Sequence, residues 1–464
     1  MNARDNQLTL YNTMSRSMEA FEPLTDDGSV RMYNCGPTVY NYQHIGNLRS
    51  YVFADILRRT LEANGYAVTQ IINITDVGHL VSDGDTGQDK MTKGLHREGL
   101  PITLDGMVQL GEKYTEVFKD DLKKLNIKKP EAFPKASDYI KEDIALVEIL
   151  ETKGFTYNTD DGIYFDTSKL KDYGKLTGNQ VDDEQLQQRV QNEQKRNARD
   201  FALWKFDNKL GWNSPWGQGF PGWHIECSVM SMQHLGEAFD IHTGGIDHIN
   251  VHHTNEIAQS EAATGKEMAR YWLHNDHISI DGEKISKSLG NTVHLNELVD
   301  QGYDPLSYRY LLLSARYRTK MSFTWESLDS AQNALQRLYK FMRDHSDNSG
   351  HIIASYYDDF ISAMNDDLNT PEALSVIWKL LDDKEVNTTD KVSTILEIDK
   401  ILGLSLSSPP NINVPTQVEK LAEEREEARQ ANDYQLADEL REKIEERGWQ
   451  VNDTDDGFAI TPLK

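Results

Sequence analysis

Four side chains, widely separated along the chain, offer donor atoms that a transition metal prefers. His252 and Glu256 stand four residues apart in a segment of helical pattern, so both project from the same helix face. Cys35 follows a strand-like stretch, and Cys227 ends a tryptophan-rich one. Zinc accepts sulfur, nitrogen and oxygen donors, and thiolates favour it over magnesium or calcium. Each cysteine taken alone also fits an inert buried thiol, and His252 a core histidine, so the residues leave both interpretations open.

A second group of residues suits phosphate chemistry. His44 and Asn47, within His44-Ile45-Gly46-Asn47, lie where a helix begins, and the unpaired backbone N–H groups of a helix start favour anions. Lys284 and Lys287 stand in a glycine-bounded loop, from which two ammonium groups could reach a polyphosphate. A Lys-Ser loop alone is common. Together with the strand–turn–helix pattern around His44, it predicts a nucleotide site.

The elements that must position these residues begin with a strand–helix–strand unit. Residues 29–35 have a strand pattern that Gly36-Pro37 breaks, and a helix with one apolar face then runs to Gly65. Residues 66–76 are rich in β-branched side chains, so the unit should be a right-handed parallel crossover. We also expect the elements that follow along the chain: a helix at 99–124, a loop lining the site at 211–227, strands at 238–242 and 272–280, and a helix at 251–263.

Composition is typical of a large folded protein of the cytoplasm. The 464 residues, 38% of them hydrophobic, can bury several cores, and no apolar run approaches the length of a membrane span. The first residues lack the apolar region of a signal peptide, and the two cysteines lie far apart, so we expect a cytoplasmic location and no structural disulfide. The net charge of −26 is unfavourable for a nucleic-acid partner but does not exclude one, because short basic runs could form local patches.

Long motifs of the chain resemble the cysteinyl-tRNA synthetases, a family of class I aminoacyl-tRNA synthetases. The similarity runs from about residue 8 to residue 460, with blocks at YNCGPTVY (33–40), PGWHIEC (221–227), HHTNE (252–256) and DGEKISKSLGN (281–291). The resemblance implies an α/β fold. In it, a Rossmann-like parallel-sheet catalytic domain is split by an α+β insertion and followed by a helical anticodon-binding domain.

The resemblance also implies an activity, the ATP-dependent ligation of L-cysteine to tRNA(Cys) through a cysteinyl-adenylate. One zinc ion would be held by Cys35, Cys227, His252 and Glu256, and it would take the thiolate of cysteine as a further ligand. A pocket that reads shape alone separates cysteine poorly from serine, whereas zinc favours the softer sulfur, so we expect no editing domain. By the same likeness, Thr75 and Trp223 would wall the cysteine pocket.

ATP, with Mg²⁺ bridging its oxygens, would lie against the two signatures. The resemblance implies that His44 and Asn47 stabilise the charge on the phosphates, and that Lys284 and Lys287 bind the leaving pyrophosphate. Glycines that let the backbone approach the nucleotide would be Gly46, Gly244 and Gly245.

In the C-terminal segment, the resemblance implies contacts with the tRNA anticodon. Arg429 and Asp438 would contact its first base, Asp453 its second, and Tyr434 would offer a stacking face. A charged, solvated helix with ordinary i, i+4 pairs fits each of these residues about as well. We expect a monomer whose partners are tRNA(Cys), ATP and L-cysteine, with no membrane contact.

Changes of pattern along the chain, taken with the resemblance, predict six parts. These are the first half of the catalytic domain (1–128), an acceptor-binding insertion (129–210), the second half of the catalytic domain (211–275), a lysine-loop and stem-contact region (276–326), a helical bundle (327–406), and a linker with the anticodon-recognition segment (407–464).

Some positions depart from the family pattern. Asn47 stands where many class I enzymes have histidine, and Ile285 where methionine is usual. Phe220 replaces an arginine often found before Pro-Gly-Trp, and Asn250-Val251 stands where many members have Phe-Pro. An amide and an apolar side chain can keep the roles of the first two, so these changes are expected to alter rates rather than chemistry.

Two other functions fit part of the pattern. A cysteine ligase of the same fold that acts on an amino-sugar acceptor would share the zinc and both signatures. It would lack the full region after Ser327, which this chain carries. A non-catalytic zinc protein that only binds a partner would have no use for His44, Lys284 and Lys287 as a polyphosphate clamp.

Overall fold

The computed structural model describes residues 7–78, 90–178, 194–280, 283–284, 292–345, 349–409, 416–447, 449–454 and 457–462. The chain forms two compact units, which are described separately. The larger comprises Met1–Leu335 and His345–Leu404, and the smaller comprises Gln336–Asp344 and Ser405–Lys464.

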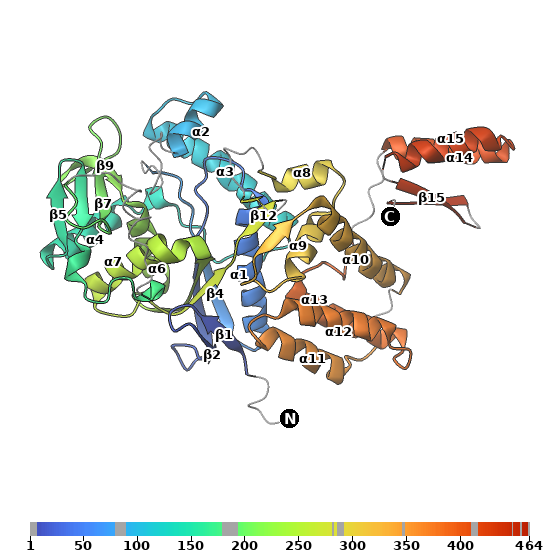
Figure 1. Ribbon diagram of the computed structural model, residues 1–464, viewed down its shortest axis with the longest axis horizontal. Helices are drawn as coiled ribbons and strands as arrows, with labels where there is room; N and C mark the ends of the chain where they lie inside the picture. The colour runs from blue at the N-terminus through green and yellow to red at the C-terminus, as the bar shows by residue number, and fades with distance from the viewer. Residues whose placement is uncertain are drawn as a thin grey trace. The chain divides into compact units, whose positions relative to one another are not determined.

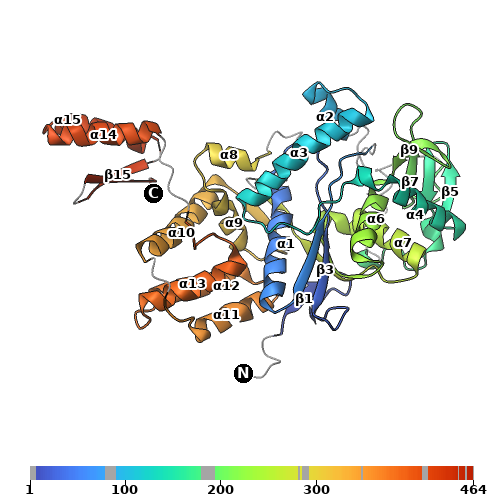
Figure 2. The same ribbon diagram turned by 180° about the vertical axis from the view of Figure 1, so that it is seen from behind.

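A parallel four-stranded sheet is the centre of the larger unit (Figure 1). Its order is β11 (Ala269–Asn275), β10 (Phe239–Gly245), β3 (Ser29–Asn34) and β4 (Ala67–Ile72), and each neighbouring pair is parallel. The β3 strand continues into β4 through helix α1 (Ile45–Ala63), which lies beside β3 in Figure 2. The predicted parallel crossover is therefore confirmed.

The apolar face of α1 explains why this helix lies against the core. The predicted stripe is buried throughout: Ile45, Leu48, Val52, Ile56 and Leu57. Farther along α1, the buried carboxylate of Asp55 accepts hydrogen bonds from Arg309 at 2.6 Å and Arg59 at 2.7 Å, while Arg309 also donates to the carbonyl of Leu402. These bonds join α1 to α9 (Pro305–Leu313), which carries Arg309, and to the end of α13 (Thr388–Leu402).

Strand order reverses between β3 and β10, because the connection after β3 leads to β4 on one side while β10 and β11 lie on the other. In open α/β sheets, ligands bind outside the carboxyl ends of the strands at such a switch point. Cys35 follows β3 directly, and Gly244 and Gly245 end β10.

An antiparallel five-stranded sheet is formed by strands that lie between β4 and β10 in the sequence. Its order is β5 (Thr156–Thr159), β6 (Gly162–Phe165), β7 (Phe201–Phe206), β9 (Gly217–Pro221) and β8 (Trp212–Ser214). The loop expected at residues 211–227 is wrong: the segment forms the β8–β9 hairpin and the start of α6 (Trp223–Leu235). Two of its three tryptophans pack against other side chains: Trp212 meets Phe220 edge to face at 5.5 Å, and Trp216 lies against a cluster of buried apolar residues.

Helices α2 (Lys90–Glu98), α3 (Leu104–Lys124) and α4 (Ile140–Thr152) lie between the two halves of the parallel sheet in the sequence. The helix expected from residue 99 begins only at Leu104, because the side chain of Thr103 caps it by accepting from the N–H of Gly106. Short 3₁₀ turns occur at Ala136–Asp138, Thr167–Lys169, Lys175–Thr177 and Ile246–His248.

The helix expected at residues 251–263 is not a regular α-helix over its whole length. A π-helical turn, Ile249–His253, precedes the regular helix α7 (Thr254–Thr264). Such π turns are rare and occur often at functional sites. The expected strand at 272–280 is likewise two strands, β11 and β12 (Ile278–Ile280).

The rest of the larger unit contains a small sheet, helices and an N-terminal hairpin. Strand β12 pairs with β13 (Glu283–Lys284) and β14 (Met321–Phe323). The other elements are β1 (Thr9–Asn12), β2 (Ser17–Ala20), α8 (Leu295–Asp300), α9 (Pro305–Leu313), α10 (Trp325–Asp344), α11 (Ala354–Asn365), α12 (Thr370–Asp382) and α13 (Thr388–Leu402). The end of α10 falls in the smaller unit.

The smaller unit has its own core. Helices α14 (Thr416–Gln430) and α15 (Tyr434–Glu445) pack with the hairpin of β15 (Trp449–Thr454) and β16 (Gly457–Pro462). The buried residues of this core include Val418, Ala422, Ile444 and Val451.

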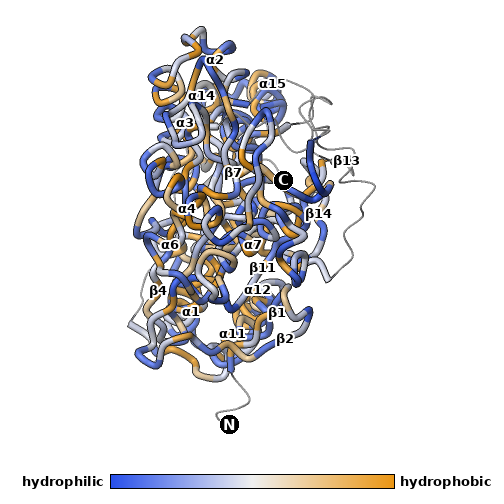
Figure 3. The backbone as a smooth tube through the Cα atoms, turned by 90° about the vertical axis from the view of Figure 1, so that its left-hand side faces the viewer, coloured by the Kyte–Doolittle hydropathy of each residue, from blue (hydrophilic) through white to orange (hydrophobic). Residues whose placement is uncertain are grey.

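Hydrophobic residues are spread along the whole chain in short stretches broken by hydrophilic ones (Figure 3). Among the described residues, no helix combines the length and the apolar character needed to cross a bilayer.

Candidate active site and metal centre

Four different elements bring the predicted metal donors together at the switch point of the sheet. Cys35 comes from the end of β3, Cys227 from α6, His252 from the π turn and Glu256 from α7. One donor atom from each lies within 4.8 Å of the donor atoms of the other three. Glu256 Oε1 is 3.0 Å from His252 Nε2 and 3.7 Å from Cys35 Sγ. The contact between His252 and Glu256 therefore agrees with the prediction, made from their spacing, that the two side chains lie on one face.

The charges of this cluster suit a divalent cation. Burial opposes ionisation of Glu256, but His242 and His252 more than offset it and hold the pKa of Glu256 far below its usual range. A hydrogen bond with Cys35 lowers the pKa of Cys227 to about 6, whereas burial raises the pKa of Cys35 well above its usual value. The buried cluster thus concentrates negative charge on Cys227 and Glu256. Two sulfurs, one imidazole nitrogen and one carboxylate oxygen are a donor set that fits zinc.

A group of histidines around the cluster was not predicted from the sequence. His242 Nε2 lies 2.9 Å from Glu256 Oε2, and His253 Nε2 lies 3.3 Å from Cys35 Sγ. His253 is in turn 2.8 Å from His274. His242 and His253 thus contact the donor side chains of Glu256 and Cys35, and such outer partners orient metal ligands. Cys35, His242, His253 and Glu256 also form a second set of four mutually close donor atoms.

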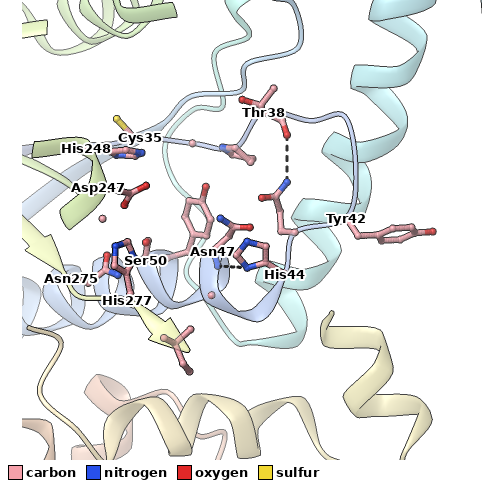
Figure 4. A pocket seen from close by; sticks show the side chains of 18 of the residues that line it. Cys35, Thr38, Tyr42, His44, Asn47, Ser50, Asp247, His248, Asn275 and His277 are labelled. Carbon is pink, nitrogen blue, oxygen red and sulfur yellow. Dashed lines mark hydrogen bonds between the residues drawn. The ribbon is translucent and has the colours of Figure 1, made fainter. Parts of the chain in front are cut away.

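A pocket of about 370 Å³ opens above the donor cluster. Figure 4 shows Cys35 and His248 at one end of it and His44 and Tyr42 at the other. Trp223 lines the pocket and stacks on His252, with ring centroids 4.1 Å apart. Thr75 is not among the described residues that line it, because Thr75 is buried and pairs with Thr38 behind the wall.

The turn after β3 sets the distance between the cysteine end and the helix end of the pocket. The N–H of Gly36 donates to Asn73 Oδ1 at 2.7 Å, and a Cβ atom at Gly36 would lie only 1.5 Å from the carbonyl oxygen of Asn73. Only glycine permits this approach of two backbones. The sequence indicated the break at this position, and the structure gives its cause.

His44 caps the helix that forms the other end of the pocket. Its Nδ1 accepts a hydrogen bond from the N–H of Asn47 at 3.2 Å (Figure 4), and the N–H of Ile45 donates to the carbonyl of Val293. His44, Gly46 and Asn47 all line the pocket, as do Gly244 and Gly245 at the end of β10. A helix start and glycine backbone facing one cavity suit a phosphate-bearing ligand.

Of the two predicted lysines, the structure describes Lys284 and not Lys287. Lys284 lies in the short strand β13, which pairs with β12, and nothing further is described of its side chain. Lys287 lies outside the described residues.

In the smaller unit, the structure brings two of the four predicted anticodon residues together. Arg429 of α14 forms an ion pair with Asp453 of β15, which Arg425 also contacts at 3.0 Å. Tyr434 and Asp438 are exposed on α15, Tyr434 with 64% of its surface accessible. An exposed aromatic ring can stack on a base.

Two family models match most of the chain. Residues 21–333 match the model "tRNA synthetases class I (C) catalytic domain", and residues 359–406 match the "DALR domain".

Curated proteins resemble the chain over nearly its full length. A protein from Burkholderia lata named Cysteine--tRNA ligase 1 is 48% identical over 461 residues, covering 98% of this chain and 96% of that protein. A Cysteine--tRNA ligase from Treponema denticola is 41% identical over 481 residues, covering 95% and 96%.

Solved structures share the fold. The Mycobacterium tuberculosis methionyl-tRNA synthetase in complex with methionyl-adenylate superposes with a TM-score of 0.55 at 15% identity, covering 82% of this chain and 91% of that one. A second structure of the same enzyme, also bound to methionyl-adenylate, gives a TM-score of 0.56 at 14% identity.

Proposed function

The chain belongs to the cysteine–tRNA ligases of the class I tRNA synthetases, and we propose that it joins L-cysteine to tRNA(Cys) through a cysteinyl-adenylate, with a bound zinc ion selecting cysteine over serine. The observation that carries the proposal is the buried cluster of Cys35, Cys227, His252 and Glu256, of which Cys35 lines one end of a pocket whose other end is formed by His44 and the start of α1.

The donor cluster is the selecting end of the pocket. A zinc ion held by these four side chains would offer the thiol of cysteine a position that a serine hydroxyl fills far less well. His242 and His253 keep Glu256 and Cys35 in place from behind. Trp223, stacked on His252, closes the side of the pocket and limits the size of the amino acid.

The helix end of the pocket is the activating end. A carboxylate oxygen of cysteine attacks the α-phosphorus of ATP, the bond from that phosphorus to the bridging oxygen breaks, and pyrophosphate leaves. His44, Asn47 and the N–H groups at the start of α1 stabilise the charge that builds on the phosphate oxygens. Gly46, Gly244 and Gly245 let the nucleotide approach the backbone, and Lys284 and Lys287 bind the pyrophosphate together with Mg²⁺.

Transfer to tRNA completes the reaction. A ribose hydroxyl at the 3′ end of the tRNA attacks the carbonyl of the adenylate, and AMP leaves with the bonding electrons. We propose that Arg429, Tyr434, Asp438 and Asp453 in the smaller unit contact the anticodon, and that the insertion at residues 129–210 receives the acceptor end.

Charging of total tRNA with labelled amino acids tests this function. The purified chain, ATP, Mg²⁺ and total tRNA are incubated with labelled cysteine or labelled serine, and acid-precipitable label is counted. Cysteine is expected to enter the tRNA and serine to stay at background.

Treatment with a zinc chelator, followed by restoration with zinc, is the matched control. Cysteine charging should fall and recover. Absence of cysteine transfer to tRNA, with cysteine-dependent pyrophosphate exchange intact, would contradict the tRNA acceptor and favour a ligase for another amine.

A further inference from the structure

A lysine at the start of α2, which was not predicted from the sequence as a site residue, lines the pocket. Among the described residues that line the pocket, Lys90 is the one lysine or arginine, whereas Asp247 and Asp276 contribute carboxylates. A triphosphate needs positive charge around it, and the chain as a whole carries a net charge of −26. Lys90 would therefore add an ammonium group to the two of Lys284 and Lys287, which we propose to bind the pyrophosphate.

We propose that Lys90 is a phosphate-binding residue, whose ammonium group holds the β- and γ-phosphates of ATP and the pyrophosphate that they become. This inference rests on the proposed function, because it assigns a ligand to the activating end of the same pocket.

Lys90 is held at the pocket by the packing of α2. Lys90, Gly94 and Arg97 are spaced i, i+4 and i+7, so they share one face of this helix. Arg97 Nη2 donates to the carbonyl oxygen of Tyr40 at 2.5 Å, and Tyr40 itself lines the pocket. The face of α2 that carries Lys90 is thus fixed to the pocket wall.

Gly94 brings the helix unusually close to that wall. A Cβ atom at Gly94 would lie 2.9 Å from the carbonyl oxygen of Tyr40 and 2.7 Å from Leu110 Cδ2. On the other side of α2, Met91 and Leu95 are fully buried. A helix packed on both sides holds its first residue in a defined place, so Lys90 is not a freely moving surface lysine at its backbone.

Lys90 shares its cavity with the turn that leads into α1. Tyr40 belongs to the same turn as Tyr42 and His44, and this turn ends at the start of α1. The helix start and Lys90 therefore line the same cavity, in which the helix start would face the α-phosphate. The Lys90 side chain is exposed, so its ammonium group can move to meet the outer phosphates as a compact point charge.

The experiment compares Lys90→Ala with Lys90→Arg and with Lys93→Ala. Lys93 is an exposed lysine one turn farther along the same helix and does not line the pocket, so its substitution is a control for net charge and helix integrity. Cysteine-dependent pyrophosphate exchange gives the KM values for ATP and for pyrophosphate. Binding of a sulfamoyl analogue of cysteinyl-adenylate, which has no β- or γ-phosphate, is measured by calorimetry.

Lys90→Ala is expected to raise the KM for ATP and for pyrophosphate by about 10- to 100-fold, the value of one charge-assisted hydrogen bond. Lys90→Arg should restore most of this loss, and Lys93→Ala should stay within about twofold of the wild type. Affinity for the sulfamoyl analogue should be the same in all four proteins, whereas a merely structural role of Lys90 would lower it.

Equal KM values for ATP in Lys90→Ala and Lys93→Ala would overturn the proposal, and so would a loss of affinity for the analogue in Lys90→Ala. Failure of the proposed cysteine activation would look different, since the wild type would then show no cysteine-dependent exchange, whereas failure of the tRNA acceptor alone would leave exchange measurable. In that case, calorimetry with ATP alone on the wild type and Lys90→Ala still decides whether Lys90 binds a triphosphate.

Discussion

The two ends of the pocket differ in how they hold charge. At one end, Cys35 lines the pocket and Cys227, His252 and Glu256 are clustered with it, all four being 0–8% exposed; we call this buried cluster the floor. At the rim, Asn47 is exposed and Tyr42 is 41% exposed, and the groups that face the pocket include backbone at a helix start.

This difference corresponds to the two proposed roles, in which the floor selects the amino acid and the rim stabilises charge on ATP. Buried anions are costly unless a positive charge compensates them, so the cation that we propose at the floor would compensate Cys227 and Glu256, and substitutions there should be poorly tolerated. Exposed groups at the rim are screened by water until the substrate displaces it, so changes there should alter rates while leaving the folded protein intact.

The largest expected effect comes from the floor. Cys227→Ser should reduce bound zinc from about one per chain to near none and lower cysteine activation by more than about 100-fold, because even an outer partner of a metal ligand is worth up to that much. Metal analysis and pyrophosphate exchange measure the two effects. Ser231→Ala, which removes a buried hydroxyl from the same helix, is the control and should keep its zinc.

Stoichiometric zinc in Cys227→Ser would contradict the first donor set. It would point to the second set, in which His242 and His253 replace Cys227 and His252.

At the rim, His44→Ala should lower the rate of pyrophosphate exchange by about 100-fold, because it removes a group that stabilises charge in the transition state. The zinc content should stay near that of the wild type, while loss of the N-cap of α1 should lower the free energy of unfolding by about 0.5–2 kcal/mol. A variant that loses zinc together with activity would show that the two ends are not separate.

Trp223 lies between the two ends and should have an intermediate effect. Trp223→Ala removes the ring that stacks on His252 and opens the pocket wall, so the KM for cysteine should rise by about tenfold. The KM for ATP should change little, and steady-state exchange at varied cysteine and ATP separates the two. An equal rise in both constants would place Trp223 in a structural role.

The smallest effect tests the cost of burial outside the pocket. Desolvation raises the pKa of Asp121, a buried residue of α3, from 3.8 to about 7. The folded protein therefore keeps a proton that the unfolded chain has lost between about pH 4 and pH 7, so stability falls as the pH rises through this window.

Asp121→Asn removes that dependence. Relative to the wild type, the variant should gain about 2 kcal/mol of stability between pH 5 and pH 8, and urea unfolding at both values measures it. A constant difference at the two pH values would mean that Asp121 is ionised in the folded protein as it is in the unfolded chain.

The sequence predicted the parts of the site that follow from local pattern. Cys35 at a strand end, His44 at a helix start and the shared helix face of His252 and Glu256 all depend on neighbouring residues, and the structure agrees with each. That Cys227 joins them depends on the long-range packing of α6; the residue types made Cys227 a candidate, and the family resemblance decided against an inert buried thiol.

Other features have no local signal. His242, His253 and His274 support the donors from separate turns and strands, and the adjacent pair His252-His253 was the one hint in the sequence. The segment 211–227 was predicted as a loop lining the site, whereas it forms the β8–β9 hairpin and the start of α6, from which Trp223 lines the pocket. The place of Lys90 depends on how α2 packs against Tyr40, which no periodicity reveals.

The central claim is that the thiol of cysteine is recognised by a metal held at the floor of the pocket. The zinc-free chain is loaded with cobalt(II), and its thiolate-to-cobalt charge-transfer absorbance is recorded before and after addition of cysteine or serine. Our account predicts that cysteine increases this absorbance and that serine leaves it unchanged. A spectrum that does not respond to cysteine, in protein that still binds cobalt at one ion per chain, would contradict it.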